Sequence, residues 1–376
     1  MRLESNIYKL YVIKAAKWFM LVMPIIVLFY QENGLHALDV MQLQAIYSVA
    51  IVVMEIPSGY FADILGRKNT LVIGSILGTL GFVVYSFSHG FWGFLLAEIT
   101  LGIGQSFISG SDSALLFDTL KELKDEKKYL QLEGRVLSLG NFAETIAAFA
   151  GGALAEISLR TPFIVQTFVA FAAVPAALMI VEPKRKKSTE NNPFLHILSI
   201  VKMSLFDNKE LRLNILYSGV VGSATLAMAW LVQIYLKDVY GFSGFYIGIV
   251  WGILNLIVGL ATLSAYKVEK ILSLRTTLFL IAIFISTSYI FLGLISSYWG
   301  AIFLILFYYT RGIATPVLKN YINNLTTSDI RATVLSVRNF VIRIIFALAG
   351  PFFGWLNDVY TISQAFITAG IIYLII

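Results

Sequence analysis

The stretch Gly59-Tyr60-Phe61-Ala62-Asp63-Ile64-Leu65-Gly66-Arg67-Lys68 links an apolar run that ends near residue 62 to another that starts near residue 70. Such a short link leaves the chain little room, and Gly59 and Gly66 allow close backbone approach or a positive φ. Asp63 and Arg67 are four residues apart, which places opposite charges side by side if the helix continues. Arg67 and Lys68 put two positive charges at a membrane exit, which marks that side as cytoplasmic.

The pattern Gly-x-x-x-Asp-x-x-Gly-Arg-Lys, placed between the second and third apolar runs, resembles the signature loop of the major facilitator superfamily of secondary transporters. The resemblance implies an all-α membrane protein whose helices form two pseudo-symmetric six-helix bundles around a central cavity. One departure is Ile64, which stands where that family often carries a basic residue. The alternative is an ordinary positively charged cytoplasmic hairpin, in which glycine and basic residues are common.

The composition favours a helical membrane protein. The chain has 376 residues, of which 58% are hydrophobic and 13% are charged. A soluble domain of this composition would expose too much apolar surface. Repeated apolar runs of about 20 residues instead fit helices that span a bilayer. Alternating segments of strand length do not occur in the sequence, which argues against a membrane β-barrel.

Charge, cysteine and histidine content exclude several other classes. The net charge is +6, but the basic residues sit at membrane exits, so topology explains them better than nucleic-acid binding does. The sequence has no cysteine, and its three histidines are not at metal-ligand spacing. It also has no Walker loop and no constellation typical of a hydrolase. We therefore expect no enzyme, no cofactor, no metal site and no nucleic-acid partner.

The apolar runs predict twelve transmembrane helices. They cover residues 8–30, 40–63, 70–88, 91–117, 134–157, 161–182, 211–237, 243–267, 276–295, 299–325, 332–356 and 361–376. Lysine and arginine concentrate at the exits of the even-numbered helices, which places both termini in the cytoplasm.

One long linker divides the predicted helices into two groups of six. The N-terminal bundle covers residues 1–182, the cytoplasmic linker covers 183–210, and the C-terminal bundle covers 211–376. Apolar residues between Phe194 and Leu205 suggest a short interfacial helix within the linker, although a solvated basic linker is the simpler alternative.

Two internal repeats support a duplicated six-helix unit. The segment 136–142 recurs at 334–340, and Ser58-Gly59-Tyr60 with Asp63 recurs as Ser264-Ala265-Tyr266 with Glu269. This arrangement places Asp63 near the start of the helix 332–356 and Glu269 near the start of the helix 134–157. A carboxylate is favoured beside a helix N-terminus. We therefore expect a conformational latch on the cytoplasmic side, formed by Gly59, Asp63, Gly66, Arg67, Lys68 and Glu269.

Ionisable residues inside the apolar runs are functional candidates because each costs about 2.5–3.5 kcal/mol on insertion scales. The candidates for proton coupling are the carboxylates Glu98, Glu55, Glu144 and Asp112. The second half carries bases instead, namely Arg311, Arg338 and Arg343. We expect part of this charge to be neutralised between the two halves.

The run 91–117 carries a polar stripe. Its polar and small residues recur at spacings of four and three, namely Glu98, Gly102, Gln105, Ser109 and Asp112. In the resembled family, helices 1, 4, 7 and 10 line the central cavity. That implies the substrate-cavity candidates Lys17, Gln105, Tyr217, Gln233, Arg311 and Thr315, and Arg343 of the run 332–356 is a further candidate. The alternative is a buried polar network that only fixes helix register, and Lys14 can instead reach the lipid head groups.

Two stretches, 55–59 and 109–118, resemble a bacterial drug-efflux-like branch of the superfamily, which implies the bacterial cytoplasmic (inner) membrane. Glu98 departs from that resemblance. It lies four residues before Gly102, where many proton-coupled exporters of the superfamily carry an arginine. Antiport therefore does not follow from the resemblance alone.

The leading hypothesis is a monomeric transporter that exports small amphipathic compounds in exchange for protons across the lipid bilayer. Burial disfavours the charged form of a carboxylic acid. Such a group can therefore release its proton when the cavity opens to the cytoplasm. Glu98 is the first choice as proton carrier and Glu55 the second. The alternative is an importer or facilitator of a polar or anionic metabolite, in which Lys17, Arg311 and Arg343 bind the substrate. A non-transporting membrane receptor is the third hypothesis.

Overall fold

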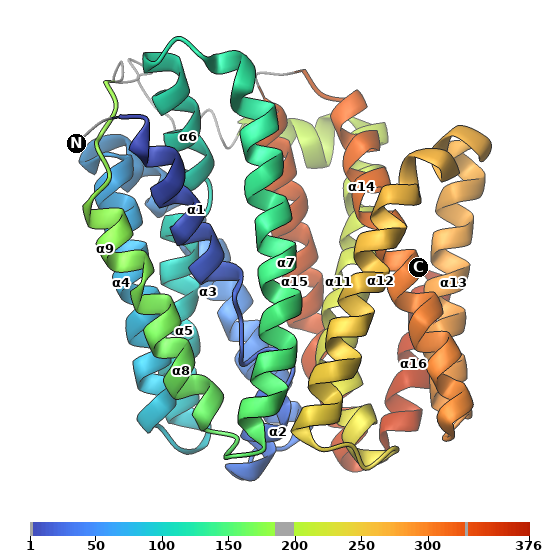
Figure 1. Ribbon diagram of the computed structural model, residues 1–376. Coiled ribbons are helices and arrows are strands. Elements are labelled where there is room, and N and C mark those ends of the chain that lie inside the picture. Colours follow the sequence, from blue (N-terminus) through green and yellow to red (C-terminus); the bar gives the residue numbers. More distant parts are fainter. Residues whose placement is uncertain (1–2, 185–198, 328–329) are drawn as a thin grey trace. The chain divides into compact units, whose positions relative to one another are not determined.

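The computed structural model describes residues 3–184, 199–327 and 330–376, and every regular element in these ranges is helical (Figure 1). The helices before the linker are α1 (Ser5–Trp18), α2 (Ile26–Glu32), α3 (Ala37–Leu65), α4 (Arg67–Phe87), α5 (Gly90–Ile108), α6 (Ser111–Glu122), α7 (Tyr129–Ala155), α8 (Thr161–Phe171) and α9 (Ala173–Leu178). Those after it are α11 (Lys209–Asp238), α12 (Gly244–Ile271), α13 (Leu274–Leu294), α14 (Ala301–Asn324), α15 (Arg331–Val359) and α16 (Ile362–Ile375).

Within the described ranges, nine helices are long and apolar enough to cross a membrane. Two shorter apolar helices cover Phe142–Ala155 and Ile362–Ile375. The chain is therefore a multi-pass helical membrane protein, as the composition predicts, whereas the count of twelve spans stays a prediction. Of the expected interfacial helix, residues 194–198 lie outside the described ranges, and the chain from 199 to 207 is helical.

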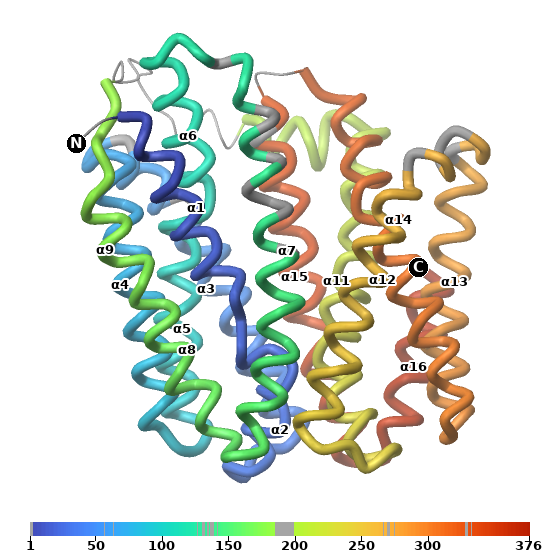
Figure 2. The backbone as a smooth tube through the Cα atoms, viewed as in Figure 1, coloured from blue at the N-terminus to red at the C-terminus, as the bar shows by residue number. Residues whose placement is uncertain are grey.

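The first predicted helix, 8–30, is interrupted. The backbone leaves the helical path between α1 and α2, at residues 19–25 (Figure 2). Pro24 lies in this segment and cannot donate a helical hydrogen bond. The side chain of Gln166 in α8 accepts a hydrogen bond from the Leu21 N–H at 2.8 Å. An irregular backbone at membrane depth is tolerated where the surrounding protein satisfies it in this way.

The predicted helix 91–117 is also interrupted. It divides into α5 and α6 at Ser109 and Gly110, and Gly110 has a φ of 79°. A glycine adopts this left-handed conformation without a steric penalty. The single continuous polar stripe expected from Glu98 to Asp112 is therefore wrong, because the two carboxylates belong to different helices.

The chain forms two compact units. Unit 1 contains residues 1–34, 46–190 and 243–252, and unit 2 contains residues 35–45, 191–242 and 253–376. The first turns of α3 belong to unit 2 and those of α12 belong to unit 1. The two six-helix bundles separated by a linker at residues 183–210 stay a prediction.

Each unit has its own apolar core. In unit 1, α4 packs along α5 (Figure 1). A Cβ atom on Gly74 would lie 2.9 Å from the Gly104 carbonyl oxygen, so small residues are needed where these two helices meet. In unit 2, α13 packs on α16 and α11 packs on α15. Ile215, Ile322 and Val337 lie in a core cluster shared by α11, α14 and α15.

Candidate functional site

The carboxylate of Glu98 lies inside unit 1 and is 4% exposed. Glu98 belongs to α5, and its Oε1 accepts hydrogen bonds from two tyrosine hydroxyls. Tyr30 in α2 donates at 2.8 Å and Tyr85 in α4 donates at 2.6 Å. The two hydroxyl oxygens also lie in close contact with each other, so two hydroxyl protons are shared among three polar contacts. Three helices thus converge on one carboxyl oxygen.

Fully buried aromatic rings enclose these polar groups. The Phe94 ring centroid lies 5.3 Å from that of Tyr30 and 5.6 Å from that of Tyr85. The Phe163 ring lies 5.2 Å from that of Tyr85. An apolar enclosure disfavours a charged carboxylate, whereas hydroxyl donors favour it. Hydroxyl donors thus hold the carboxyl group of Glu98 inside an apolar enclosure.

Arg160, which directly precedes α8, is held close to this cluster by other partners. Its Nη1 donates to the backbone oxygens of Ser86 at 2.9 Å and Ser88 at 3.0 Å. Its Nη2 donates to Asn33 Oδ1 at 3.2 Å, and its guanidinium carbon lies 5.0 Å from the Phe29 ring centroid. Arg160 therefore ties the end of α4 to the segment after α2.

Asp112 forms a second, separate site in unit 1. Its carboxylate pairs with Lys14 Nζ of α1, and both residues are buried. It also accepts a hydrogen bond from the Ser113 N–H at 2.8 Å and interacts electrostatically with Lys17. The idea that Lys14 reaches the lipid head groups is wrong, because its ammonium group is bound to this carboxylate.

Three other candidates of unit 1 make no described contact with the residues around Glu98 or around Asp112. Glu55, Glu144 and Gln105 are half-buried in α3, α7 and α5. Glu55 and Glu144 each interact with another residue.

The candidates of unit 2 take several different partners. The Tyr217 hydroxyl donates to the Leu278 carbonyl oxygen at 2.6 Å, and buried Gln233 donates to the Ala229 carbonyl oxygen at 3.2 Å. Thr315 donates to the backbone oxygen of Arg311 at 3.1 Å. The Arg311 guanidinium lies 5.6 Å from the Tyr308 ring centroid, and Arg343 is half-buried in α15 with a partner of its own.

The loop before α4 is held by a residue that the sequence pattern did not single out. Glu182 accepts hydrogen bonds from the backbone N–H groups of Arg67 at 2.8 Å and Lys68 at 2.7 Å, so it caps α4. Gly66 has a φ of 97°, and a Cβ there would lie 2.8 Å from Glu182 Oε1. The Arg67 side chain lies 3.7 Å from the Asp118 carboxylate.

The structure describes the other members of the expected latch only in part. The side chains of Asp63 and Glu269 lie outside the described residues, so their expected helix-capping roles remain predictions. Gly59 lies within α3 and is exposed.

Two further carboxylates, at the C-terminal ends of α7 and α15, cap the starts of other helices. In unit 2, Asp358 accepts hydrogen bonds from the N–H groups of Ala37 at 2.9 Å and Leu38 at 2.7 Å, at the start of α3. In unit 1, Glu156 accepts from Ser243 Oγ at 2.9 Å and from the Phe245 N–H at 3.2 Å, at the start of α12.

The two caps share a local sequence pattern. A glycine precedes each carboxylate by four residues, namely Gly354 before Asp358 and Gly152 before Glu156. A Cβ on Gly354 would lie 2.7 Å from the Ala37 carbonyl oxygen, and one on Gly152 would lie 3.0 Å from the Gly244 carbonyl oxygen. Each glycine thus allows the close helix approach that brings its carboxylate to the capped helix.

Sequence reasoning missed Tyr30, Tyr85, Arg160 and Glu182 as site residues. The tyrosines lie in apolar runs without a distinctive spacing, and Arg160 reads as an ordinary loop cation. Glu182 gives a weak signal, since it directly follows an apolar run and precedes Pro183. Among the residues that the structure describes, no group of three or more His, Cys, Asp or Glu side chains could hold a metal ion.

Comparisons with known proteins agree on one family. The sequence model of the Major Facilitator Superfamily matches residues 10–345. The quinolone resistance protein NorA of Staphylococcus aureus is 23% identical over 368 residues, which cover 93% of this chain and 89% of that protein.

Solved structures show a similar fold at low identity. The nucleoside transporter NupG has a TM-score of 0.78 at 14% identity, covering 100% of this chain and 96% of that chain. A bacterial homologue of the human lysosomal transporter Spinster, in an inward-facing and unoccupied conformation, has a TM-score of 0.78 at 15% identity, covering 99% of this chain and 95% of that chain.

Proposed function

Because the chain belongs to the Major Facilitator Superfamily, whose sequence model matches residues 10–345, we propose that it is a proton-coupled secondary transporter that exports small amphipathic compounds by alternating access. We further propose that the protein is a monomer in the bacterial cytoplasmic membrane. Its two halves would each have six helices, and both termini would lie in the cytoplasm. The similarity to a quinolone resistance protein over 93% of this chain supports export.

The observation that carries proton coupling is the environment of Glu98. Its carboxyl group is buried among aromatic rings and bound by the hydroxyls of Tyr30 and Tyr85. A buried acid at membrane depth is costly and calls for a functional explanation. Proton release from Glu98 would add a charge to an apolar enclosure, so its protonation state would bias the protein toward one conformation.

The test is transport by membrane vesicles with an imposed proton gradient, with ethidium as a small amphipathic probe. We expect Glu98→Gln to reduce gradient-driven transport to the level of vesicles without the protein, while exchange without a gradient persists. Glu210→Gln serves as a control, because Glu210 is exposed at the start of α11. Wild-type pH-dependent transport in Glu98→Gln would remove Glu98 from the mechanism.

The second candidate function is import or facilitated diffusion of a polar or anionic metabolite. The observation that favours it is the positive charge of Arg311, Lys319, Arg338 and Arg343 within the apolar helices of unit 2. Uptake in right-side-out against inside-out vesicles separates the two functions, because export and import differ in the side from which a gradient drives accumulation.

A further inference from the structure

Arg338 is buried in α15 without a carboxylate partner among the described residues. It is 5% exposed, and it lies about 10 Å along the helix from Arg331 at its start. Its Nε donates to Ser218 Oγ of α11, and its Nη1 donates to Asn339 Oδ1 at 3.3 Å. Both acceptors are neutral. Removing a guanidinium from water without a counter-charge is unfavourable, so this arrangement calls for a negative charge.

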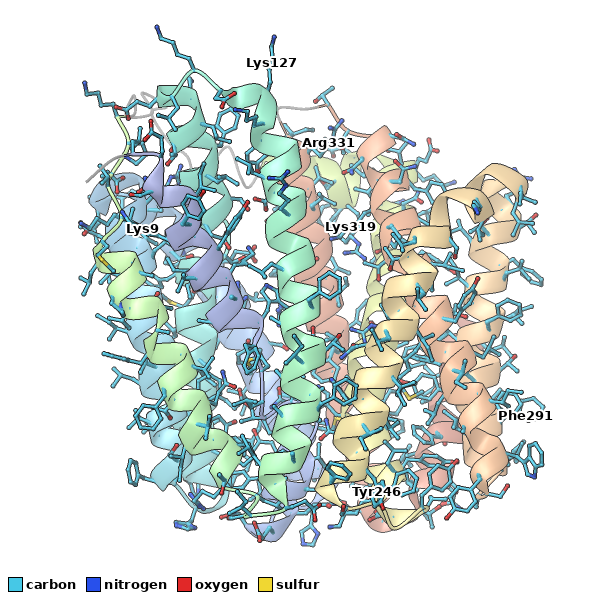
Figure 3. All side chains as sticks on the ribbon, in the orientation of Figure 1. Lys9, Lys127, Tyr246, Phe291, Lys319 and Arg331 are labelled. Carbon is cyan, nitrogen blue, oxygen red and sulfur yellow. The ribbon has the colours of Figure 1, made fainter. Side chains whose placement is uncertain are left out.

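Lys319 of α14 adds a second positive charge nearby. It interacts electrostatically with Arg338, and its side chain is exposed. In Figure 3, Arg331 lies at the end of unit 2 where α15 begins, and Lys319 lies further from that end. Arg311, Thr315 and Lys319 are spaced by four residues, so they lie along one face of α14. The exposed Lys319 therefore continues a polar face within an apolar helix.

The described helices of this half of the chain offer no carboxylate at that depth. The acidic residues of 209–376 whose backbone the structure describes all lie within three residues of a helix end, namely Glu210, Asp238, Glu269 and Asp358. Asp358 is occupied at the start of α3. The counter-charge for Arg338 and Lys319 is therefore not supplied by the middle of any helix that the structure describes in this half.

We propose that Arg338 and Lys319 bind the anionic group of a transported compound, a carboxylate, sulfonate or phosphate. The proposal rests on the proposed transport function and adds amphipathic compounds that carry a negative charge to its substrate class. Ser218 holds Nε, so Nη1 and Nη2 still offer N–H donors, and arginine pairs with oxyanions through two parallel hydrogen bonds. Lys319 contributes a second, compact positive charge.

The test uses a matched pair of probes, 2-naphthoate and its neutral analogue 2-naphthamide, with the purified full-length protein in a non-ionic detergent. We expect naphthoate to raise the unfolding temperature saturably and naphthamide to leave it unchanged. Arg338→Gln should weaken naphthoate binding roughly tenfold or more, since a charge-assisted hydrogen-bonded pair is lost. Arg331→Gln is the matched control, because Arg331 is an exposed arginine of the same helix, and it should bind naphthoate as the wild type does.

A second variant keeps the test decisive if Arg338→Gln does not fold. Lys319 is exposed and makes no described hydrogen bond that folding requires, so Lys319→Gln should fold and bind naphthoate severalfold more weakly. Equal effects of naphthoate and naphthamide on the wild type would overturn the proposal. Unchanged naphthoate binding in Lys319→Gln and in every folded Arg338 variant would also overturn it.

Two further measurements distinguish a transported anion from a lipid head group, and the anion site from the transport function. Phosphatidylglycerol added to the micelles tests a lipid head group. If that lipid stabilises the protein through Arg338 while naphthoate does not, the site binds lipid and the proposal is wrong. The ethidium transport assay is independent: a protein that transports ethidium but does not bind naphthoate overturns the anion site alone, and one that binds naphthoate but does not transport contradicts the proposed function alone.

Discussion

At the scale of single residues, the pair formed by Lys14 and Asp112 is expected to contribute to the stability of the fold. Both side chains are buried, and the pair links α1 to α6. Removing one partner leaves the other charge buried without compensation, so we expect Asp112→Ala to lower the free energy of unfolding by about 3–5 kcal/mol. Replacing both, with Lys14→Met and Asp112→Leu, should cost much less.

Reversible unfolding in detergent measures this difference through a double-mutant cycle. The exposed pair Lys128–Asp125 is the matched control. Because solvent screens that pair, Asp125→Ala should change the free energy of unfolding by no more than about 1 kcal/mol. If the double replacement at positions 14 and 112 is as harmful as the single one, the buried charges do not account for the loss.

At the scale of helices, the carboxylate caps at the starts of α3 and α12 are the features to test. Asp358 satisfies two N–H groups that α3 leaves unpaired in its first turn. Loss of a helix cap typically costs about 0.5–2 kcal/mol, and the helix dipole adds to the attraction of the carboxylate. We therefore expect Asp358→Ala to lower stability by about 1 kcal/mol and to speed amide exchange at Ala37 and Leu38.

Hydrogen exchange followed by mass spectrometry measures the exchange rate of the backbone amides in the first turn of each capped helix. Glu156→Ala should produce the corresponding increase at the start of α12, at Phe245. Asp207→Ala is the control, since Asp207 is an exposed carboxylate that caps no helix among the described contacts. Faster exchange spread evenly over α3, rather than concentrated in its first turn, would contradict a capping role.

At the scale of the whole molecule, the distribution of basic residues predicts the orientation in the membrane. Lys127 and Tyr246 lie at opposite ends of unit 1 (Figure 3). The natural chain has no cysteine, so single cysteines can be introduced at either position without removing others. With the basic loops in the cytoplasm, a membrane-impermeant thiol reagent should label Tyr246→Cys in intact cells and Lys127→Cys only after permeabilisation. The reverse pattern would invert the proposed topology.

The interruptions of the helices show where sequence reasoning stops. Apolar runs predicted one helix over 8–30 and one over 91–117, since hydropathy reports the length of a run and not its backbone path. The structure interrupts the first at residues 19–25, where Gln166 from a distant helix satisfies the Leu21 N–H. It interrupts the second at Gly110, whose positive φ no hydropathy pattern reveals.

The sequence by itself determined the membrane class, the approximate positions of most helices and the family. Apolar run length and the spacing from Gly59 to Lys68 are local properties, and the family model confirms the resemblance read from that loop. Only the tertiary structure decided which polar groups meet. Glu98 shares its hydrogen bonds with Tyr30, 68 residues away, and Arg338 bonds Ser218, 120 residues away. The reason is that these partners lie on different helices, and helix packing, not sequence spacing, brings them together.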